Sequence, residues 1–269
     1  MTAFTTRTHS PYRFDTVGSF LRPERLKDAR AKFEAGKLAA SELKKIEDEE
    51  IIRLIKKQEE VGLKAVTDGE FRRSWWHLDF FWGLQGIEFY EPEHGYFFHG
   101  EETRPGTVTV TGKIGGDKHP FVDHYLFTRE HASPGVDGKV TIPAPAQVLV
   151  ELFRPDNIEA VRKFYPTDQE LISDLVKAYR QVISDLYQAG ARTIQLDDCT
   201  WGVLVAPLPE GFIAEDEYKD ERTVRKELGV LYLTVNNQGS ENQPDDLILN
   251  THVCRGNYHS TWAASGGYD

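Results

Sequence analysis

Short strand-like segments alternate with helical stretches along this chain, and this alternation restricts the folds it can adopt. Residues 24–62 and 223–237 carry helical patterns. Thr167 and Glu170 form a capping box at the start of a long apolar stripe that ends at Gly190. The predicted strands are residues 14–20, 65–67, 107–114, 139–142, 193–196 and 247–251. Strands separated by helices indicate a parallel sheet.

Polar residues follow most of the predicted strands. They are Gly18 and Ser19, Asp68 and Glu70, Asp197 and Asp198, and His252 and Cys254. In a (β/α)8 barrel all of them would meet at the C-terminal face, and a doubly wound sheet makes a weaker version of the same prediction. We therefore predict an α/β fold of the (β/α)8 TIM type. Only about six strands can be counted, and an open six-stranded barrel would leave two unpaired edges, which is costly. We therefore expect a barrel that is truncated after the sixth strand.

The composition sets further limits. The 269 residues carry a net charge of −11, which argues against nucleic acid or an anionic membrane as the main partner. No apolar run approaches the ~18 residues of a membrane span, and the polar segment 1–13 lacks the core of a signal peptide. Two cysteines do not make a disulfide framework. We expect one cytoplasmic domain over residues 1–269, with an aromatic-rich insertion around 71–105.

The His-x-Cys pattern after the last predicted strand suggests a metal site. Residues i and i+2 of a strand point to the same face, so the imidazole of His252 and the thiol of Cys254 would lie side by side. Together they are half of a tetrahedral zinc site. Taken singly, each has an ordinary alternative, a satisfied polar residue for His252 and a small buried apolar one for Cys254.

Four segments together resemble one protein family. They are Thr16–Phe20, Asp68–Arg72, Ile194–Asp198 and Thr251–Cys254, in the family's order and spread over most of the chain. The chain resembles the cobalamin-independent methionine synthases, most closely the short single-barrel members related to their C-terminal catalytic domain. The stretch 72–79 looks like this short subgroup in particular. The resemblance implies transfer of a methyl group from 5-methyltetrahydrofolate or its polyglutamate to homocysteine, giving methionine.

The resemblance also implies roles for individual residues. His252 and Cys254 would bind zinc, and the remaining Glu and Cys ligands are expected beyond Asp269. Glu70 and Asp197 would act in catalysis by binding the amino group of homocysteine. The backbone around Val17, Gly18 and Ser19 would bind its carboxylate. From the residues alone, the two acids could also be helix caps or loop acids, and Gly18 could nearly as well be an ordinary turn glycine.

Several questions stay open at this level. The acid that protonates the leaving nitrogen is not assigned, although His77, Asp79 and His259 are candidates. The tryptophans at 75, 76 and 82 could stack on a pterin, but such clusters more often pack a loop. The alternatives are a related barrel that uses a corrinoid, another methyl donor or another thiol, a zinc-free tetrapyrrole decarboxylase, and a non-catalytic truncated barrel.

Overall fold

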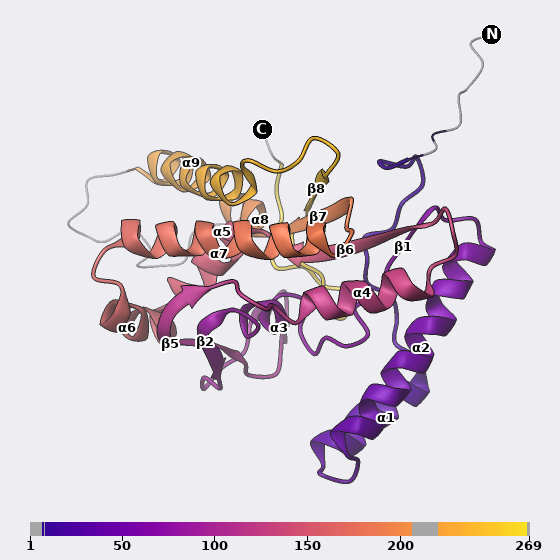
Figure 1. The fold of residues 1–269 in the computed structure, drawn as a ribbon. Helices are drawn as coiled ribbons and strands as arrows, with labels where there is room; N and C mark the ends of the chain where they lie inside the picture. Colours follow the sequence, from indigo (N-terminus) through magenta and orange to yellow (C-terminus); the bar gives the residue numbers. More distant parts are fainter. Residues whose placement is uncertain (1–6, 8, 206–219, 268–269) are drawn as a thin grey trace.

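A parallel four-stranded sheet forms the centre of the computed structural model, which describes residue 7, residues 9–205 and residues 220–267. Its strands lie in the order β1 (Ala65–Val66), β6 (Asp137–Pro143), β7 (Thr193–Asp198) and β8 (Ile248–Val253) (Figure 1). Ser19 adds a single parallel bridge to Gly69, just after β1. Within this sheet the strands lie side by side in the order in which they occur in the chain, as they do in the wall of a (β/α)8 barrel.

The two faces of β6 and β7 differ sharply in chemistry, because side chains alternate along a strand. One face joins the main hydrophobic core and is formed by Val140, Ile142, Ile194 and Leu196. The other face is polar although buried, and carries Lys139, Thr141, Gln195 and Asp197. The apolar side chains of the sheet thus face the helices, and its polar side chains face the opposite side.

Helices cover the apolar face of the sheet. The principal one, α7 (Asp168–Gln188), begins as predicted, with the Thr167 hydroxyl accepting a hydrogen bond from the backbone N–H of Glu170 at 3.3 Å. Helix α9 (Glu221–Ser240) packs beside it (Figure 1). The shorter helices are α4 (Phe121–His131), α5 (Pro145–Leu152), α6 (Pro155–Phe164) and α8 (Thr200–Val205). Among the described residues, no helix is long and apolar enough to cross a membrane.

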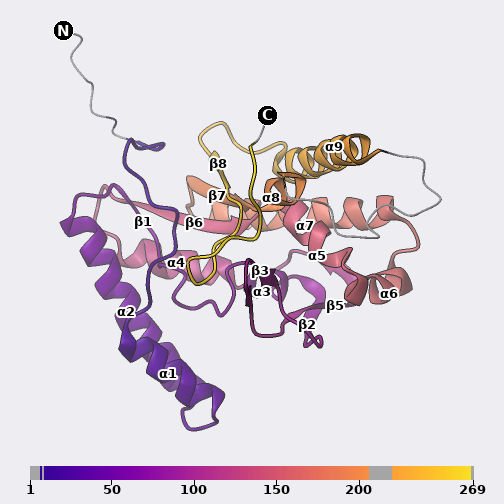
Figure 2. The same cartoon turned by 180° about the vertical axis from the view of Figure 1, so that it is seen from behind.

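The predicted helical region 24–62 is divided into two helices. They are α1 (Glu24–Glu34) and α2 (Ala40–Glu60), and the turn between them contains Gly36 with a φ of 68°. Both helices pack on a small separate core with Val66 and Phe71. Seen from either side, this pair extends away from the sheet at one end of the molecule (Figures 1 and 2).

The aromatic-rich region holds short elements of its own. These are α3 (Leu78–Phe81), β2 (Gln85–Tyr90), β3 (Phe97–Phe98), β4 (Glu101–Glu102) and β5 (Thr107–Gly115). Strand β5 was predicted as a strand, but its expected place in the barrel wall is wrong, because it pairs antiparallel with β2 outside the central sheet. The predicted strand 14–20 is reduced to the Ser19 bridge. The count of six barrel strands therefore becomes four strands and one bridge within the described residues.

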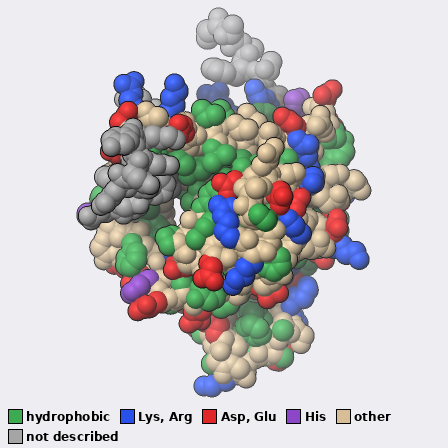
Figure 3. Space-filling model, turned by 90° about the vertical axis from the view of Figure 1, so that its left-hand side faces the viewer, with side chains coloured by type: hydrophobic (Ala, Val, Ile, Leu, Met, Phe, Trp, Pro, Cys, Tyr) green, Lys and Arg blue, Asp and Glu red, His purple; other side chains and the backbone are tan. Residues whose placement is uncertain are grey.

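The surface shows no strong segregation of charge on the face drawn in Figure 3. Basic and acidic side chains are interspersed there with apolar ones. With a net charge of −11 for the chain, this pattern gives no basic patch on that face.

Candidate functional site

Glu70 lies just beyond β1, at the C-terminal edge of the sheet. Its backbone is left-handed, with a φ of 59°, and its side chain is buried on the polar side. The carboxylate accepts a hydrogen bond from the Thr141 hydroxyl at 2.8 Å and forms an ion pair with Arg73 at 3.2 Å. A buried carboxylate with these partners is held in one orientation, facing the end of β6.

Asp197 is the second carboxylate at this edge. It lies at the end of β7 on the same polar face as Thr141, and its Oδ1 accepts a hydrogen bond from Gln195 at 2.7 Å. Burial raises the pKa of Asp197 to about 7, the negative charge of Glu70 adds to the rise, and the Gln195 hydrogen bond opposes it. Two acids that act on each other in this way form a site that favours a cation.

Asp198 points to the other side of the sheet, as expected for its place in the strand. Its Oδ1 accepts a hydrogen bond from the backbone N–H of Thr200 at 2.9 Å, and its Oδ2 accepts one from Asn236 at 2.8 Å. These contacts tie α8 and α9 to the sheet and leave this carboxylate a structural role.

Residues 17–19 lie against the same polar face. The Val17 carbonyl accepts a hydrogen bond from Gln195 at 2.6 Å, and the Gly18 carbonyl accepts one from the Thr67 hydroxyl at 2.6 Å. Gly18 has a φ of +127°, and a Cβ there would lie 2.4 Å from Cγ2 of Thr141. Within the described residues, no backbone carbonyl accepts a hydrogen bond from the N–H groups of Gly18 and Ser19. Those two donors can therefore bind an anion.

Arg73 belongs to this site and was not predicted. Its guanidinium is buried and donates to the carbonyl of Thr141 at 2.6 Å and to the carbonyl of Trp76 at 3.1 Å, beside the Glu70 carboxylate. It also lies over the ring of Phe121, at 4.4 Å from the centroid. The spacing of Glu70 and Arg73 alone does not mark this pair, because it depends on the burial of both side chains.

His252 and Cys254 extend the site along the next strand. In the sheet register His252 lies opposite Asp197, and both side chains of the His-x-Cys pattern are half-buried. The sulfur of Cys254 lies 2.9 Å from that of Cys199, which follows β7. The hydrogen bond with Cys199 lowers the pKa of Cys254 to about 6, with smaller contributions from the Gly256 backbone and from His252, while burial opposes the shift. The same contact, together with burial, raises the pKa of Cys199.

Two of these side chains fit a zinc ion, although a full ligand set is not assembled. An imidazole and a thiol on one strand are donors that zinc prefers. In the part of the chain that the structure describes, no group of three or more His, Cys, Asp or Glu side chains could hold a metal ion. His252 and Cys254 would thus supply two of the ligands.

The candidates for a general acid lie elsewhere. His77 is fully buried, its Nε2 lies 3.2 Å from the Tyr96 hydroxyl, and burial lowers its pKa to about 3. Asp79 accepts hydrogen bonds from Ser74 and the backbone N–H of Trp75. His259 is exposed beside Glu101. Among the described residues, no hydrogen bond or ion pair links any of the three to Glu70 or Asp197.

The tryptophans of the aromatic region pack within it. The rings of Trp75 and Tyr96 meet edge to face at 5.6 Å, and the Trp76 ring lies 4.6 Å from that of His77. Trp82 donates its indole N–H to the carbonyl of Thr107 at 3.1 Å. These contacts favour the packing interpretation over a pterin platform.

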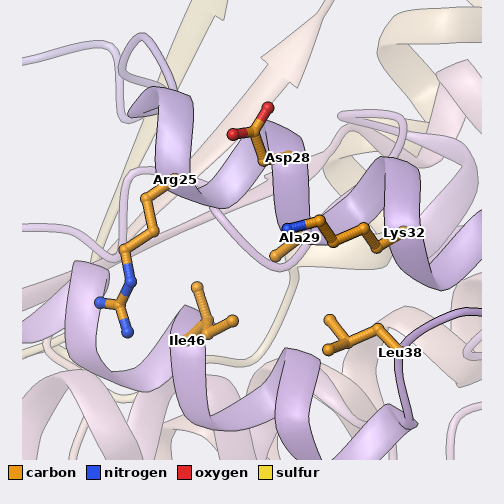
Figure 4. A pocket seen from close by; sticks show the side chains of 6 residues that line it. All are labelled: Arg25, Asp28, Ala29, Lys32, Leu38 and Ile46. Carbon is orange, nitrogen blue, oxygen red and sulfur yellow. The ribbon is translucent and has the colours of Figure 1, made fainter.

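A cavity of about 430 Å³ lies between α1 and α2, and none of the predicted site residues lines it (Figure 4). Three charged and three apolar side chains line it, and all three charged ones come from α1. Its lining residues are Arg25, Asp28, Ala29, Lys32, Leu38 and Ile46. The buried acids and the potential metal ligands lie at the sheet edge and not in this cavity.

Comparison with known proteins agrees with this arrangement. The family described as "Cobalamin-independent synthase, Catalytic domain" matches residues 14–258, a range that includes every residue of the sheet edge named above. The chain belongs to this family. The predicted resemblance is therefore confirmed.

Individual proteins are similar to this chain over much of its length. The uncharacterized protein YxjH of Bacillus subtilis is 40% identical over 266 residues, which cover 97% of this chain and 66% of YxjH. A methionine synthase of Saccharolobus solfataricus is 27% identical over 202 residues, covering 70% of this chain and 55% of that protein. The chain thus spans about two thirds or less of the length of these two relatives.

A solved structure supports the fold. A vitamin-B12-independent methionine synthase-like protein from Listeria monocytogenes superposes with a TM-score of 0.71 at 37% identity. The match covers 92% of this chain and 67% of that protein. The predicted α/β class, with the parallel sheet of this barrel family, is confirmed.

Proposed function

We propose that this chain is the single catalytic barrel domain of a zinc-dependent S-methyltransferase. Its substrates would be homocysteine and a methylated folate, 5-methyltetrahydrofolate or its polyglutamate, and its product methionine. The observation that carries the proposal is the pair of buried carboxylates, Glu70 and Asp197, at one sheet edge beside His252. The choice of a folate donor rests on the family, whose members work without cobalamin.

The site has the charges that an amino acid requires. The ammonium group of homocysteine would lie between Glu70 and Asp197, and its charge would keep Asp197 ionised. Its carboxylate would accept hydrogen bonds from the N–H groups of Gly18 and Ser19. Arg73 would hold Glu70 in place through their ion pair. The substrate's own two charges thereby fix the direction in which its side chain points.

The thiol of homocysteine would point toward His252 and Cys254 on β8. A zinc ion bound there would deprotonate that thiol and so make it a nucleophile at neutral pH. His252 and Cys254 would hold this ion as two of its ligands. Their position opposite the end of β7 supports this, since it brings them next to the proposed amino-group site.

The first test is homocysteine binding. Asp197→Asn should weaken the affinity, measured by calorimetry with zinc and a non-thiol reductant present, at least about tenfold, because a charge-assisted hydrogen bond is lost. Asp198→Asn is the matched control, since this neighbouring acid faces the helices and should leave the affinity unchanged. An unchanged affinity in Asp197→Asn would show that the amino group binds elsewhere.

The second test is zinc binding by competition with a chromophoric chelator. His252→Ala and Cys254→Ser should each weaken zinc at least about tenfold, because each removes a donor atom. His259→Asn is the control, as this exposed histidine lies just beyond the strand and asparagine accepts its φ of 47°. Equal zinc affinity in all three variants would exclude the two ligands.

A further inference from the structure

The two cysteines of the chain meet although 55 positions separate them. Cys199 directly follows β7 and Cys254 directly follows β8, and the register pairs Asp198 with Val253. The cysteines therefore occupy the next pair of opposite positions, and their sulfur atoms lie 2.9 Å apart. Neighbouring strands lie ~4.8 Å apart, which is within the ~4.4–6.8 Å between Cα atoms that a disulfide requires.

The surrounding structure holds both cysteines in reach of each other. Gly202 in α8 lies against the second cysteine, since a Cβ there would be 3.2 Å from the Cys254 carbonyl and 3.3 Å from Cα of Arg255. The first turn of α8 is fastened by the hydrogen bond from Thr200 to Asp198. Both cysteines are half-buried, so a small reagent can reach them.

We propose that Cys199 and Cys254 form a redox-active dithiol that a small disulfide oxidises to an intramolecular disulfide. One cysteine sulfur, as thiolate, attacks the small disulfide, whose S–S bond breaks and releases one thiolate with the electron pair. The second cysteine loses its proton to water and attacks the mixed disulfide, which releases the second thiolate. Two protein thiols are oxidised and one small disulfide is reduced to two thiols.

Disulfide formation would compete with metal binding for the sulfur atom of Cys254. If Cys254 is a zinc ligand, a point that rests on the proposed function, its sulfur cannot bind zinc and Cys199 at once. Oxidation would then release zinc, and bound zinc would protect the dithiol. Formation of the disulfide in the metal-free chain does not depend on the proposed function.

The test is treatment of the metal-free chain with oxidised glutathione, followed by intact-mass measurement and thiol titration in denaturant. The wild type should lose both titratable thiols and two hydrogen atoms, with little bound glutathione. Cys199→Ser and Cys254→Ser should keep a glutathione adduct, at least about tenfold more abundant than in the wild type, because no neighbouring thiol removes it. Circular dichroism checks that both variants fold.

Two results would overturn the dithiol. One is wild-type protein that accumulates glutathione adducts as strongly as the single variants. The other is wild-type protein that keeps both thiols free. Repeating the reaction with zinc separates the two proposals. Slower oxidation with zinc supports both the dithiol and Cys254 as a ligand, whereas an unchanged rate of disulfide formation supports the dithiol and counts against the ligand.

Discussion

An alanine at position 18 should damage the site more than one added methyl group suggests. The new Cβ would lie 2.4 Å from Cγ2 of Thr141, and the φ of +127° is one that side chains rarely adopt. Backbone strain costs about 1–3 kcal/mol, and overpacking costs about 1–3 kcal/mol more. We expect Gly18→Ala to lower the free energy of unfolding by about 4 kcal/mol, and the Tm by about 10 °C in a chain of this size.

Two further variants separate strain from overpacking in a thermal unfolding assay. Gly36→Ala is the control for strain, because its φ is +68° and nothing lies within 4 Å of the added atom. It should cost only about 1 kcal/mol. Thr141→Ser removes the clashing methyl group and keeps the hydroxyl that binds Glu70. In that background Gly18→Ala should cost about 1–2 kcal/mol less. A Gly18→Ala protein as stable as Gly36→Ala would refute the reasoning.

Two other changes test the buried charges. Glu70→Gln leaves its buried arginine partner without its ion pair and should lower the free energy of unfolding by about 3 kcal/mol. Glu60→Gln, at an exposed ion pair, should lower it by less than about 0.5 kcal/mol. Urea unfolding measures both. Two buried histidines and one half-buried histidine should make the chain acid-sensitive, because removal from water lowers their pKa values to about 3 or 4 and unfolding lets them gain a proton. The three are His77, His119 and His124. Stability should therefore fall as pH drops below about 6.5, by up to about 1.4 kcal/mol per pH unit for each, and a pH-independent Tm between pH 7 and 5 would contradict this.

The sequence predicted the edge of the sheet well, because a strand places alternate residues on one face. Asp197 and His252 were each predicted at a strand end, and they are opposite each other in the register. The same alternation directs Asp198 to the opposite face, where it bonds to Asn236 of α9. The N-cap bond at Thr167 also formed, since it depends only on neighbouring residues.

Contacts between residues far apart in the sequence were harder to predict. Residues 107–114 alternate as a strand should, but alternation does not name a partner, and β5 pairs with β2 instead of joining the sheet. Cys199 and Cys254 lie side by side because of the register between β7 and β8, and no local sequence pattern predicts that register. Arg73 was missed because its role depends on burial beside Glu70, which follows from the assembled core.

The hydrogen bond between Gln195 and the Val17 carbonyl spans 178 positions, and this has a consequence for how the protein forms. A ribosome releases residue 17 long before residue 195, so the segment 17–19 has no anchor on β7 until most of the chain has emerged. Contacts of such wide separation form slowly. A nascent chain stopped before β7 would therefore hold residues 17–19 only through their contacts with Thr67 and Gly69, and their final position would be fixed when β7 is added.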